Sequence, residues 1–358
     1  MSDTITDYDY LIVGHGIAGA AMAWHLHEIN KSFQIVNDPS LPSSSYVAAG
    51  IFNPLTGKKM NKTWLADDLF PFADSFYKNL QEKLGADFVH STPLYRPYRS
   101  IEEQNSYLAQ SEDERVASYI GDHHDQSSIA EYVNMKYGAL EIARAGWIDM
   151  PLLLDRSRSF FLANNLYLEC AFDVNELIPN ENFVVWKGLK YKKVILCQGF
   201  AATGNNYFSW LAFNPVKGQI LEIDTEDVLK PYIINQGIFI LPVKEKQARV
   251  GATYSWEPLD WQPTREAAAE LEEKLKQLLK VPYKITGHVA GIRPSVTDRK
   301  PLIGTHPEHN NICIFNGLGT KGVTLAPFFA NQFVQHLENG KELNPLVNIK
   351  RYFSLYFR

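Results

Sequence analysis

A cluster of glycines between an apolar strand and an apolar helix constrains this chain more than any other feature of its sequence. Residues 8–13 (YDYLIV) have the pattern of a short buried strand, and residues 14–19 (GHGIAG) follow at once. Residues 20–29 are apolar on one face of a helix, and residues 33–36 (FQIV) predict a second strand. Strand, glycine turn, helix and strand form a βαβ unit, which predicts a parallel sheet with a dinucleotide site at the turn.

Each glycine of this turn has a separate physical role in such a unit. Gly14 makes the tight turn, Gly16 lets the backbone approach a pyrophosphate, and Gly19 lets the helix pack closely on the strand. The phosphates would lie at the helix N-terminus, beside the backbone of Ile17 and Ala18. An ordinary glycine-rich turn is the alternative interpretation.

The end of the second strand carries the candidates for ribose binding. The strand ends at Asn37 and Asp38, and Asp38 lies 19 positions beyond Gly19, where such units usually place an acidic residue. Either side chain could accept a hydrogen bond from a ribose hydroxyl, the asparagine without a charge. Both residues therefore remain candidates.

Composition narrows the class of protein. The chain has 358 residues, 45% of them hydrophobic, and a formal net charge of −5, which argues against a nucleic acid as its main partner. Its three cysteines contain no Cys-x-x-Cys pair, which favours a reducing compartment and gives no zinc site. The N-terminus is acidic, and no apolar run approaches the about 20 residues that span a bilayer. We therefore expect a cytoplasmic protein without a membrane segment; no pattern specifies an oligomeric state.

The middle of the chain predicts further elements. Residues 39–64 read as a long loop that contains Ser45, Ala49 and Gly50, and helices are expected over 65–84 and 150–163. Residues 95–137 are expected to mix short strands with polar turns. Within them, the acidic run 112–114 predicts a solvated helix start, and His123-His124 predicts a surface loop more than half of a metal site. We expect no bound metal.

The second half of the chain predicts a different sheet. Strands are expected over 193–197, 213–223, 233–241 and 248–254, and a charged helix over 264–279. This succession predicts an α/β (α+β) fold in which a mainly antiparallel, substrate-binding sheet is inserted into a Rossmann-like βαβ domain. The expected segments are 1–85, 140–212 and 286–345 for the nucleotide-binding domain, 86–139 and 213–285 for the inserted domain, and 346–358 for a C-terminal tail.

A second glycine turn lies near the C-terminus. The strand 312–315 (ICIF) leads into residues 316–322 (NGLGTKG), and a helix is expected over 323–337. The N-terminus of that helix would supply amides and a positive dipole, which stabilise negative charge on a bound ring or phosphate.

Eight motifs carry a resemblance to a known family. They are GHGIAG at 14–19, AAG at 48–50, VILCQG at 194–199, PVKGQ at 215–219, FILP at 239–242, VGATY at 250–254, GIRPSVTDRKPLIG at 291–304, and GLGTKG at 317–322. Together and in this order they resemble the D-amino-acid oxidase superfamily of FAD-dependent amine oxidases, with glycine oxidase and sarcosine oxidase types the most similar.

The resemblance implies a fold, a cofactor and a reaction. It implies two domains, bound FAD, and oxidation of a C–N bond in a small amine that carries a carboxylate. Hydride would pass to the flavin, the imine would hydrolyse, and dioxygen would reoxidise the flavin. Residues 293–298 contain no cysteine, unlike sarcosine oxidases that attach flavin covalently near this position, so noncovalent FAD is expected.

The resemblance also suggests site residues. Arg293 takes the position of the arginine that binds the substrate carboxylate, although a structural salt bridge is the alternative role. Tyr254, at the end of its strand, would face the substrate or else be a core aromatic, and Lys321 would lie near the flavin pyrimidine edge or else in solvent. The residues expected to bind the cofactor are Gly14, Gly16, Ile17, Ala18, Gly19, Asn37, Asp38, Ser45, Ala49, Gly50, Val174, Gly199, Gly317, Leu318, Gly319, Thr320, Lys321 and Gly322.

Two departures from the family pattern leave alternatives open. Asn37 stands where a ribose-binding glutamate is usual, and Phe239 stands where glycine-oxidase-like enzymes often have a tyrosine. A non-catalytic flavin-binding protein is therefore one alternative. Another comes from residues 317–327, the loop 49–54 and the helix expected at 70–77, which also resemble the FAD-containing half of the bifunctional enzyme that acts on carboxymethylaminomethyl-uridine in tRNA. Its substrate would keep a secondary amine and a carboxylate, but a nucleic-acid partner is disfavoured at this net charge.

Overall fold

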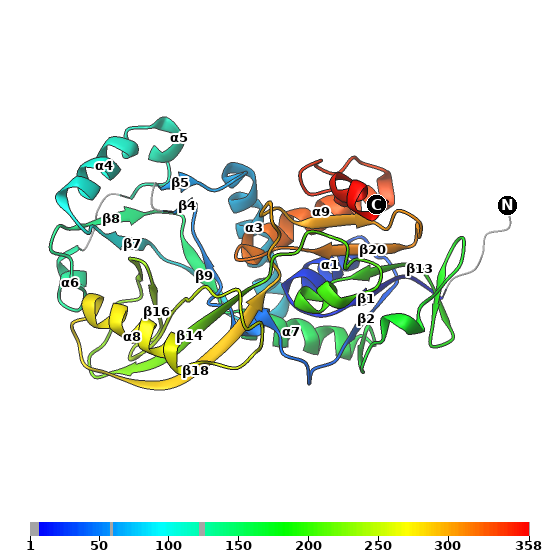
Figure 1. The fold of residues 1–358 in the computed structure, drawn as a ribbon, viewed down its shortest axis with the longest axis horizontal. Helices are drawn as coiled ribbons and strands as arrows, with labels where there is room; N and C mark the ends of the chain where they lie inside the picture. The colour runs from blue at the N-terminus through cyan, green and yellow to red at the C-terminus, as the bar shows by residue number, and fades with distance from the viewer. Residues whose placement is uncertain (1–6, 58–59, 122–125, 358) are drawn as a thin grey trace.

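The structure is a computed structural model that describes residues 7–57, 60–121 and 126–357. Two large sheets dominate it (Figure 1). One lies with the N-terminal strands and the helices α1 and α9, and the other lies at the opposite end of the molecule with α8 across it. The described residues also form two small sheets. The expected combination of a parallel Rossmann-like sheet and a separate, largely antiparallel sheet is confirmed.

The first sheet has a parallel core. Strand β1 (Tyr8–Val13) lies between β2 (Phe33–Asn37) and β13 (Leu189–Leu196), and β20 (Ile312–Asn316) continues the parallel pairing beside β13. Successive residues of β1 point to opposite faces, and Leu11 and Ile12 are both fully buried, in two different hydrophobic clusters. Both faces are therefore covered, as expected for parallel strands. The remaining strands of this sheet are β10 (Tyr167–Glu169), parallel to β2, and the antiparallel β11 (Ile178–Pro179), β12 (Val184–Trp186) and β19 (Leu302–Thr305).

Helices cover the face of this sheet that Ile12 occupies. α1 (Ile17–Glu28) packs against α9 (Gly322–Asn339), which in turn contacts α3 (Ala66–Leu84). α7 (Met150–Ala163) also contacts α1, where the indole N–H of Trp24 donates to Ser157. The strands and helices nearest the two glycine turns thus form one layered unit.

The second sheet is assembled from separated parts of the chain. Its order is β18-β14-β17-β16-β15-β7-β8, and among the residues that the structure describes its only parallel pair is β15 with β7. α8 (Arg265–Leu278) buries Leu271 and Leu275 in a cluster with side chains of this sheet. The strands are β7 (Leu94–Pro97), β8 (Ala139–Ile142), β14 (Val216–Thr225), β15 (Ile233–Asn235), β16 (Phe239–Lys244), β17 (Gln247–Gly251) and β18 (Tyr283–Arg293). The expected boundaries between the two domains stay predictions. The boundary between residues 139 and 140 falls inside β8, and the boundary between residues 285 and 286 falls inside β18.

Small elements connect the two large sheets. A three-stranded sheet has the order β3-β9-β6, and β4 pairs with β5. These elements and the remaining short helices are α2 (Ser44–Val47), β3 (Ile51–Phe52), β4 (Leu55–Thr56), β5 (Asn61–Lys62), β6 (Val89–Ser91), α4 (Ile101–Ser111), α5 (Glu114–Ala117), α6 (Gln126–Ala130), β9 (Gly146–Ile148), the 3-10 turns at Val174–Glu176, Gly199–Gly204 and Ile349–Tyr352, and α10 (Phe353–Tyr356).

Residues 95–137 differ most from the prediction. Short strands and turns were expected, but α4, α5 and α6 occupy most of the described part of this region. Ser100 caps α4, because its hydroxyl accepts from the Glu103 N–H while the Glu103 carboxylate accepts from the Arg99 N–H. The acidic run does start a helix, since Asp113 caps α5. His123-His124 lies outside the described residues.

Two predicted strands of the second sheet were also wrong in extent. The strand expected over 233–241 is a hairpin, because Gly237 turns the chain with φ +80° between β15 and β16. The strand expected over 248–254 ends at Gly251, so Tyr254 lies beyond it rather than at its end. The expected loop 39–64 contains α2, β3, β4 and β5.

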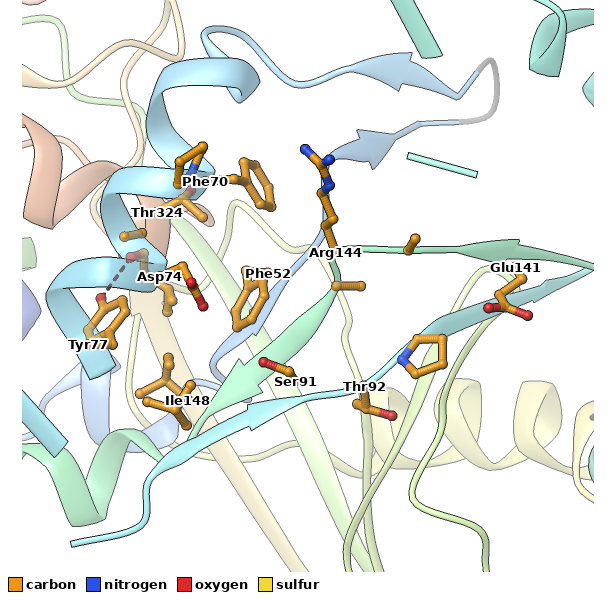
Figure 2. A pocket seen from close by; sticks show the side chains of 17 residues that line it. Phe52, Phe70, Asp74, Tyr77, Ser91, Thr92, Glu141, Arg144, Ile148 and Thr324 are labelled. Carbon is orange, nitrogen blue, oxygen red and sulfur yellow. Dashed lines mark hydrogen bonds between the residues drawn. The ribbon is translucent and has the colours of Figure 1, made fainter. Parts of the chain in front are cut away.

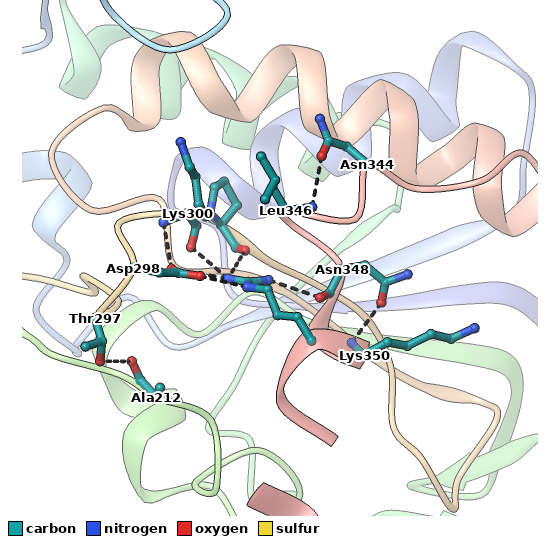
Figure 3. Close-up of polar contacts among 10 residues, drawn as sticks. Ala212, Thr297, Asp298, Lys300, Asn344, Leu346, Asn348 and Lys350 are labelled. Atoms are coloured by element: carbon teal, nitrogen blue, oxygen red, sulfur yellow. Dashed lines mark hydrogen bonds and ion pairs between the residues drawn. The ribbon is translucent and has the colours of Figure 1, made fainter. Parts of the chain in front are cut away.

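The C-terminal tail is tied to the loop that follows β18. Figure 3 shows Asp298 and Lys300 of this loop close to Asn348 of the tail. The Arg351 guanidinium donates to the Asp298 carboxylate at 2.8 Å and to the carbonyl of Pro301 at 2.9 Å. The tail therefore packs on its own chain, beside the segment that carries Arg293.

The closest approach in the βαβ unit gives a stability prediction. A Cβ added at Gly19 would lie 1.9 Å from the Gly14 carbonyl oxygen, so Gly19→Ala is expected to lower the free energy of unfolding by about 1–3 kcal/mol. Gly204→Ala is the control, since a Cβ there meets nothing within 4 Å. Urea unfolding measures both variants, and equal midpoints would contradict the packing role of Gly19.

Candidate functional site

A cavity of about 1170 Å³ lies where β1, β2, β13 and β20 end. In open parallel sheets, ligands bind in the crevice outside the carboxyl ends of the strands. Most residues predicted from the sequence to bind the cofactor or substrate line this one cavity. They are Gly14, Gly16, Ile17, Ala18, Asn37, Asp38, Ser45, Ala49, Gly50, Gly199, Tyr254, Arg293, Leu318, Gly319, Thr320 and Gly322.

Four predicted residues lie outside the lining. Gly19 faces the strand instead, in the tight contact with Gly14. Val174 does not line the cavity, although Phe172, two residues earlier, does. Gly317 turns the chain with φ +73° behind the lining, and Lys321 directs its ammonium toward the Thr63 hydroxyl, 3.4 Å away.

The three glycines of the first turn have different surroundings. Gly14 has φ +97°, and a Cβ there would lie 2.7 Å from the Cys197 carbonyl oxygen. At Gly16 the three atoms nearest to a Cβ would belong to side chains, namely the Ser45 hydroxyl at 3.0 Å, the Ser45 Cβ at 3.7 Å and the Ser43 hydroxyl at 3.8 Å. Backbone atoms therefore demand glycine at positions 14 and 19, whereas position 16 borders the cavity and meets side chains that can shift.

The N-terminus of α1 lies at this cavity. Gly16, at the N-cap, provides no side-chain cap, and Ser45 accepts from the Ile17 N–H at 3.0 Å. The N–H groups of the first helical turn and the helix dipole together favour an anion at this point. Ser45 adds a hydroxyl that can donate to the same anion.

Asn37 and Asp38 both line the cavity but differ in their contacts. The Asn37 side-chain oxygen accepts from the His15 N–H at 3.0 Å, so it fixes the first glycine turn to β2. The Asp38 carboxylate accepts from the N–H and hydroxyl of Ser40, and these hydrogen bonds lower the pKa of Asp38. Either residue retains acceptor or donor capacity toward a ligand.

His15 adds an observation that bears on what fills the cavity. Its side chain is 3% exposed, and burial, with Arg158 nearby, lowers its pKa to about 3, so the imidazole is neutral at pH 7. Its Nε2 is buried without a hydrogen-bond partner in the described part of the chain. An orphaned polar atom beside a glycine turn and a helix N-terminus fits a polar ligand such as the FAD that the sequence predicts.

The loop that carries Ala49 and Gly50 is held rigidly. The buried Arg249 donates to the carbonyls of Val47 at 2.7 Å and Ala48 at 2.9 Å. Gly50 has φ +69°, and a Cβ there would lie 1.9 Å from the Ile148 carbonyl oxygen. Arg249 was not predicted, because nothing in its local sequence marks a residue that supports a loop 200 positions away.

Arg293 ends β18 at the wall of the cavity. Its guanidinium donates to the Thr253 carbonyl at 3.2 Å and stacks on the Tyr254 ring, 4.5 Å from the ring centroid. Burial lowers the pKa of Arg293, although an arginine stays charged at neutral pH. No carboxylate of the described residues forms an ion pair with it, so the alternative of a structural salt bridge finds no partner there. A side chain on Gly218 would overlap the guanidinium, with 2.1 Å to Nη2, so that glycine makes its room.

Tyr254 is not a core aromatic residue, which was one of the two alternatives expected for it. It is 60% exposed and lines the mouth of the cavity, with its ring against Arg293. The loop beyond β17 is held by the buried ammonium of Lys217, which is 1% exposed and pairs with Asp260. The same loop brings Trp261 to the cavity, a lining residue that the sequence did not reveal.

The second glycine turn lies beside the first, because a Cβ on Gly322 would be 3.1 Å from Ile17. Leu318, Gly319 and Thr320 line it just before α9 begins. Lys321, at the start of α9, is largely buried, and burial together with Lys300 and Arg299 lowers its pKa. The backbone of residues 318–320 and the N-terminus of α9 thus lie at this end of the cavity, where backbone amides can stabilise a developing negative charge, while Lys321 lies behind the lining.

The described residues show neither a cluster of metal-binding side chains nor a helix suited to cross a membrane. Among the described residues, no group of three or more His, Cys, Asp or Glu side chains is arranged to hold a metal ion. None of the helices in the described ranges is both long and apolar enough to cross a bilayer.

Comparison with known proteins gives relatives over nearly the whole chain. Glycine oxidase of Bacillus subtilis is 25% identical over 94% of this chain and 94% of the relative. The tRNA 5-methylaminomethyl-2-thiouridine biosynthesis bifunctional protein MnmC of Marinobacter nauticus is 23% identical over 91% of this chain, but over 55% of its own length. The crystal structure of glycine oxidase from Geobacillus kaustophilus superposes with a TM-score of 0.78 at 19% identity, covering 97% of this chain and 98% of that one.

The sequence profile of one family, described as FAD dependent oxidoreductase (DAO), matches residues 9–335. That match includes both glycine turns and Arg293. The chain therefore belongs to the DAO family of FAD-dependent oxidoreductases.

Proposed function

We propose that this enzyme oxidises the C–N bond of a small amine that carries a carboxylate, an amino or imino acid, with noncovalently bound FAD and with dioxygen as the final electron acceptor. The observation that carries the proposal is the guanidinium of Arg293. It borders the cofactor cavity and has no carboxylate partner among the described residues. An unpaired buried charge is costly, so a ligand carboxylate is the natural partner.

Arg293 would bind and orient the substrate. A guanidinium can hold a carboxylate through two parallel hydrogen bonds, which fixes both position and rotation. The Tyr254 ring and the Thr253 carbonyl already hold Arg293 in place, so little side-chain freedom is lost on binding. The carbon that bears the amine would then be presented to the cofactor in one orientation.

The residues around the cavity fit FAD in a consistent arrangement. The N-terminus of α1 with Ser45 would hold the pyrophosphate, Asn37 or Asp38 the ribose, and residues 48–50 and 318–320 the flavin ring. Bound flavin supplies the hydride acceptor, and the imine product would hydrolyse in water. Cys197 lines the cavity, but burial raises the pKa of its thiol, so it stays protonated and is a poor nucleophile. This supports noncovalent binding.

The relatives support the same class of substrate. Glycine oxidase acts, by its name, on an amino acid, and the crystal structure of an iminodiacetate oxidase from Chelativorans has the same fold. Phe239 lines the cavity without a hydroxyl, so hydrogen bonding from this position is missing and the wall is apolar. Arg293 is therefore the main polar contact that we assign to the substrate.

A second candidate substrate is a carboxymethylaminomethyl group on tRNA. The similarity to MnmC relatives favours it, and the motif GLGTKGVTLAP at 317–327 resembles the FAD-containing half of such enzymes. The same Arg293 would bind the carboxymethyl group. Binding of tRNA that weakens steeply with salt would favour this candidate over a free amino or imino acid.

The reaction itself is tested by anaerobic reduction of the flavin-loaded enzyme. Glycine, sarcosine, iminodiacetate and proline are each added without oxygen, and the flavin absorption band is followed. We expect at least one of them to bleach the band, with colour returning when air is admitted. No bleaching by any carboxylated amine would refute the proposal and favour a non-catalytic flavin-binding protein.

Arg293 gives a prediction that separates substrate binding from folding. Arg293→Met is expected to raise KM for the carboxylated amine about 10- to 100-fold, since hydrogen bonds to charged groups are worth about 1.5–3 kcal/mol. Flavin content should stay normal. Arg115→Met, which removes an exposed arginine paired with Asp113, is the control. Loss of flavin with unchanged KM would assign Arg293 a structural role instead.

Gly16 tests the cofactor site independently of turnover. Gly16→Val places a side chain where the backbone borders the cavity, so purified protein should contain little flavin. Compared without flavin, the variant should lose less stability to urea than Gly19→Ala, because the atoms nearest to position 16 are side-chain atoms rather than backbone. Absorption spectra before and after acid precipitation measure flavin content and attachment. In the unaltered protein the flavin should move to the supernatant; a fully yellow Gly16→Val variant would contradict the assignment.

A further inference from the structure

A second cavity, of about 590 Å³, lies beside the cofactor cavity. Figure 2 shows it between α3, the β3-β9-β6 sheet and the start of α9, with Phe52 near its centre and Phe70 and Arg144 on opposite sides of its upper rim. Its volume is in the range of sites for small organic molecules, about 300–1,000 Å³. Most of its wall is apolar or aromatic, from side chains such as Phe52, Phe70, Ile148 and Val323.

Most polar groups at this cavity already have partners. The Asp74 carboxylate accepts from Lys78 at 2.8 Å, and the Tyr77 hydroxyl donates to the Val323 carbonyl at 2.7 Å. The Thr92 hydroxyl donates to the Pro231 carbonyl. At the far side of the cavity, the buried Glu141 carboxylate accepts from the Tyr95 hydroxyl at 3.0 Å (Figure 2). None of these groups is free to give the cavity a strong preference for charge.

Arg144 is the exception. It is exposed, its guanidinium lies 5.6 Å from the centroid of the Tyr119 ring, and no carboxylate in the described ranges lies within ion-pair distance of it. The Asp67 carboxylate is already bonded to Lys62 and to the Tyr119 hydroxyl, which lower the pKa of Asp67, and Arg144 only helps to lower that pKa further. An arginine at the rim of an apolar cavity can bind the anionic end of a ligand whose body fills that cavity.

The backbone at Arg144 supports a functional role. Its φ is +53°, in the left-handed region that favours glycine, so the chain keeps an arginine where glycine would be less strained. Strain of this kind concentrates at ligand sites. The guanidinium makes no hydrogen bond within the described residues that would account for its retention.

We propose that this cavity is a binding site for an apolar monocarboxylate, with the carboxylate on Arg144 and the hydrocarbon body between Phe52, Phe70 and Ile148. The site is distinct from the one that we assign to Arg293, and the proposal does not depend on the reaction. It adjoins the cofactor cavity all the same. Val323 lines both cavities, and in β3 Ile51 lines one while Phe52 lines the other.

The test uses the flavin-loaded protein and two probes of equal shape, 3-phenylpropionate and the uncharged 3-phenylpropanol. Isothermal titration calorimetry should show one site for the carboxylate and at least tenfold weaker binding of the alcohol. Arg144→Gly should weaken 3-phenylpropionate at least tenfold. The same variant should resist urea as well as, or better than, the unaltered protein, because glycine relieves the left-handed backbone.

Two control variants check that the probe binds at Arg144 and not at another cation. Lys187→Gly also removes an exposed cation at positive φ (+49°), one that lies over the Trp186 ring, and should leave probe binding unchanged. Arg293→Met should leave it unchanged as well. Equal binding by Arg144→Gly, equal affinity for the alcohol, or loss of binding in Arg293→Met would overturn the proposal. Ala143→Phe, which fills the cavity from its wall, should abolish binding even where Arg144 is intact.

Discussion

The contact between α1 and β1 is the constraint on which the rest of the molecule depends. The helix approaches the strand so closely that a single methyl group at Gly19 would overlap the Gly14 carbonyl oxygen. This approach aims the N-terminus of α1 at the carboxyl edge of the sheet, where β2, β13 and β20 also end. Because α9 packs on α1, the second glycine turn comes to the same edge. The cofactor cavity is thus a consequence of backbone packing before any functional side chain is considered.

Three positively charged side chains near that cavity differ in the partners that the protein gives them. Lys217 is buried but paired with Asp260, and the largely buried Arg249 donates to two carbonyls and has the Glu222 carboxylate 3.9 Å from its Nε. The Arg293 guanidinium donates to the Thr253 carbonyl and stacks on the Tyr254 ring, and it forms no ion pair with a carboxylate among the residues described. The first two arrangements satisfy the cation inside the protein, whereas the third keeps a charge available for a ligand. Preorganised charge of this kind binds an anion without first reorganising the site.

The sequence predicted the parts of the fold that have strong local signals. α7 runs over Met150–Ala163 as expected, because Asp149 caps it and a proline follows in its first turn. The βαβ unit was equally clear. The helices α4 and α6 were missed, although the capping pair Ser100 and Glu103 was visible, whereas the acidic run 112–114 does mark the start of α5. The strands β15 and β16 were merged because Gly237 was not weighted as a turn. Most of the cavity-lining residues that the sequence predicted lie in contiguous motifs. Arg249 and Trp261 reach the cavity region through contacts distant in sequence, which no local pattern reports.

The two kinds of glycine in the first turn show why fold and function can be separated in this chain. Gly14 and Gly19 exclude a side chain because polypeptide atoms occupy that space, so they would be required even in a protein that bound nothing. At Gly16 the nearest atoms belong to the side chains of Ser45 and Ser43, and the position borders the cavity. A chain that had kept the fold but lost the ligand would be under a weaker packing constraint at position 16 than at positions 14 and 19. The presence of glycine there, beside the N-terminus of α1 and a His15 Nε2 that has no partner among the described residues, therefore argues for a nucleotide site.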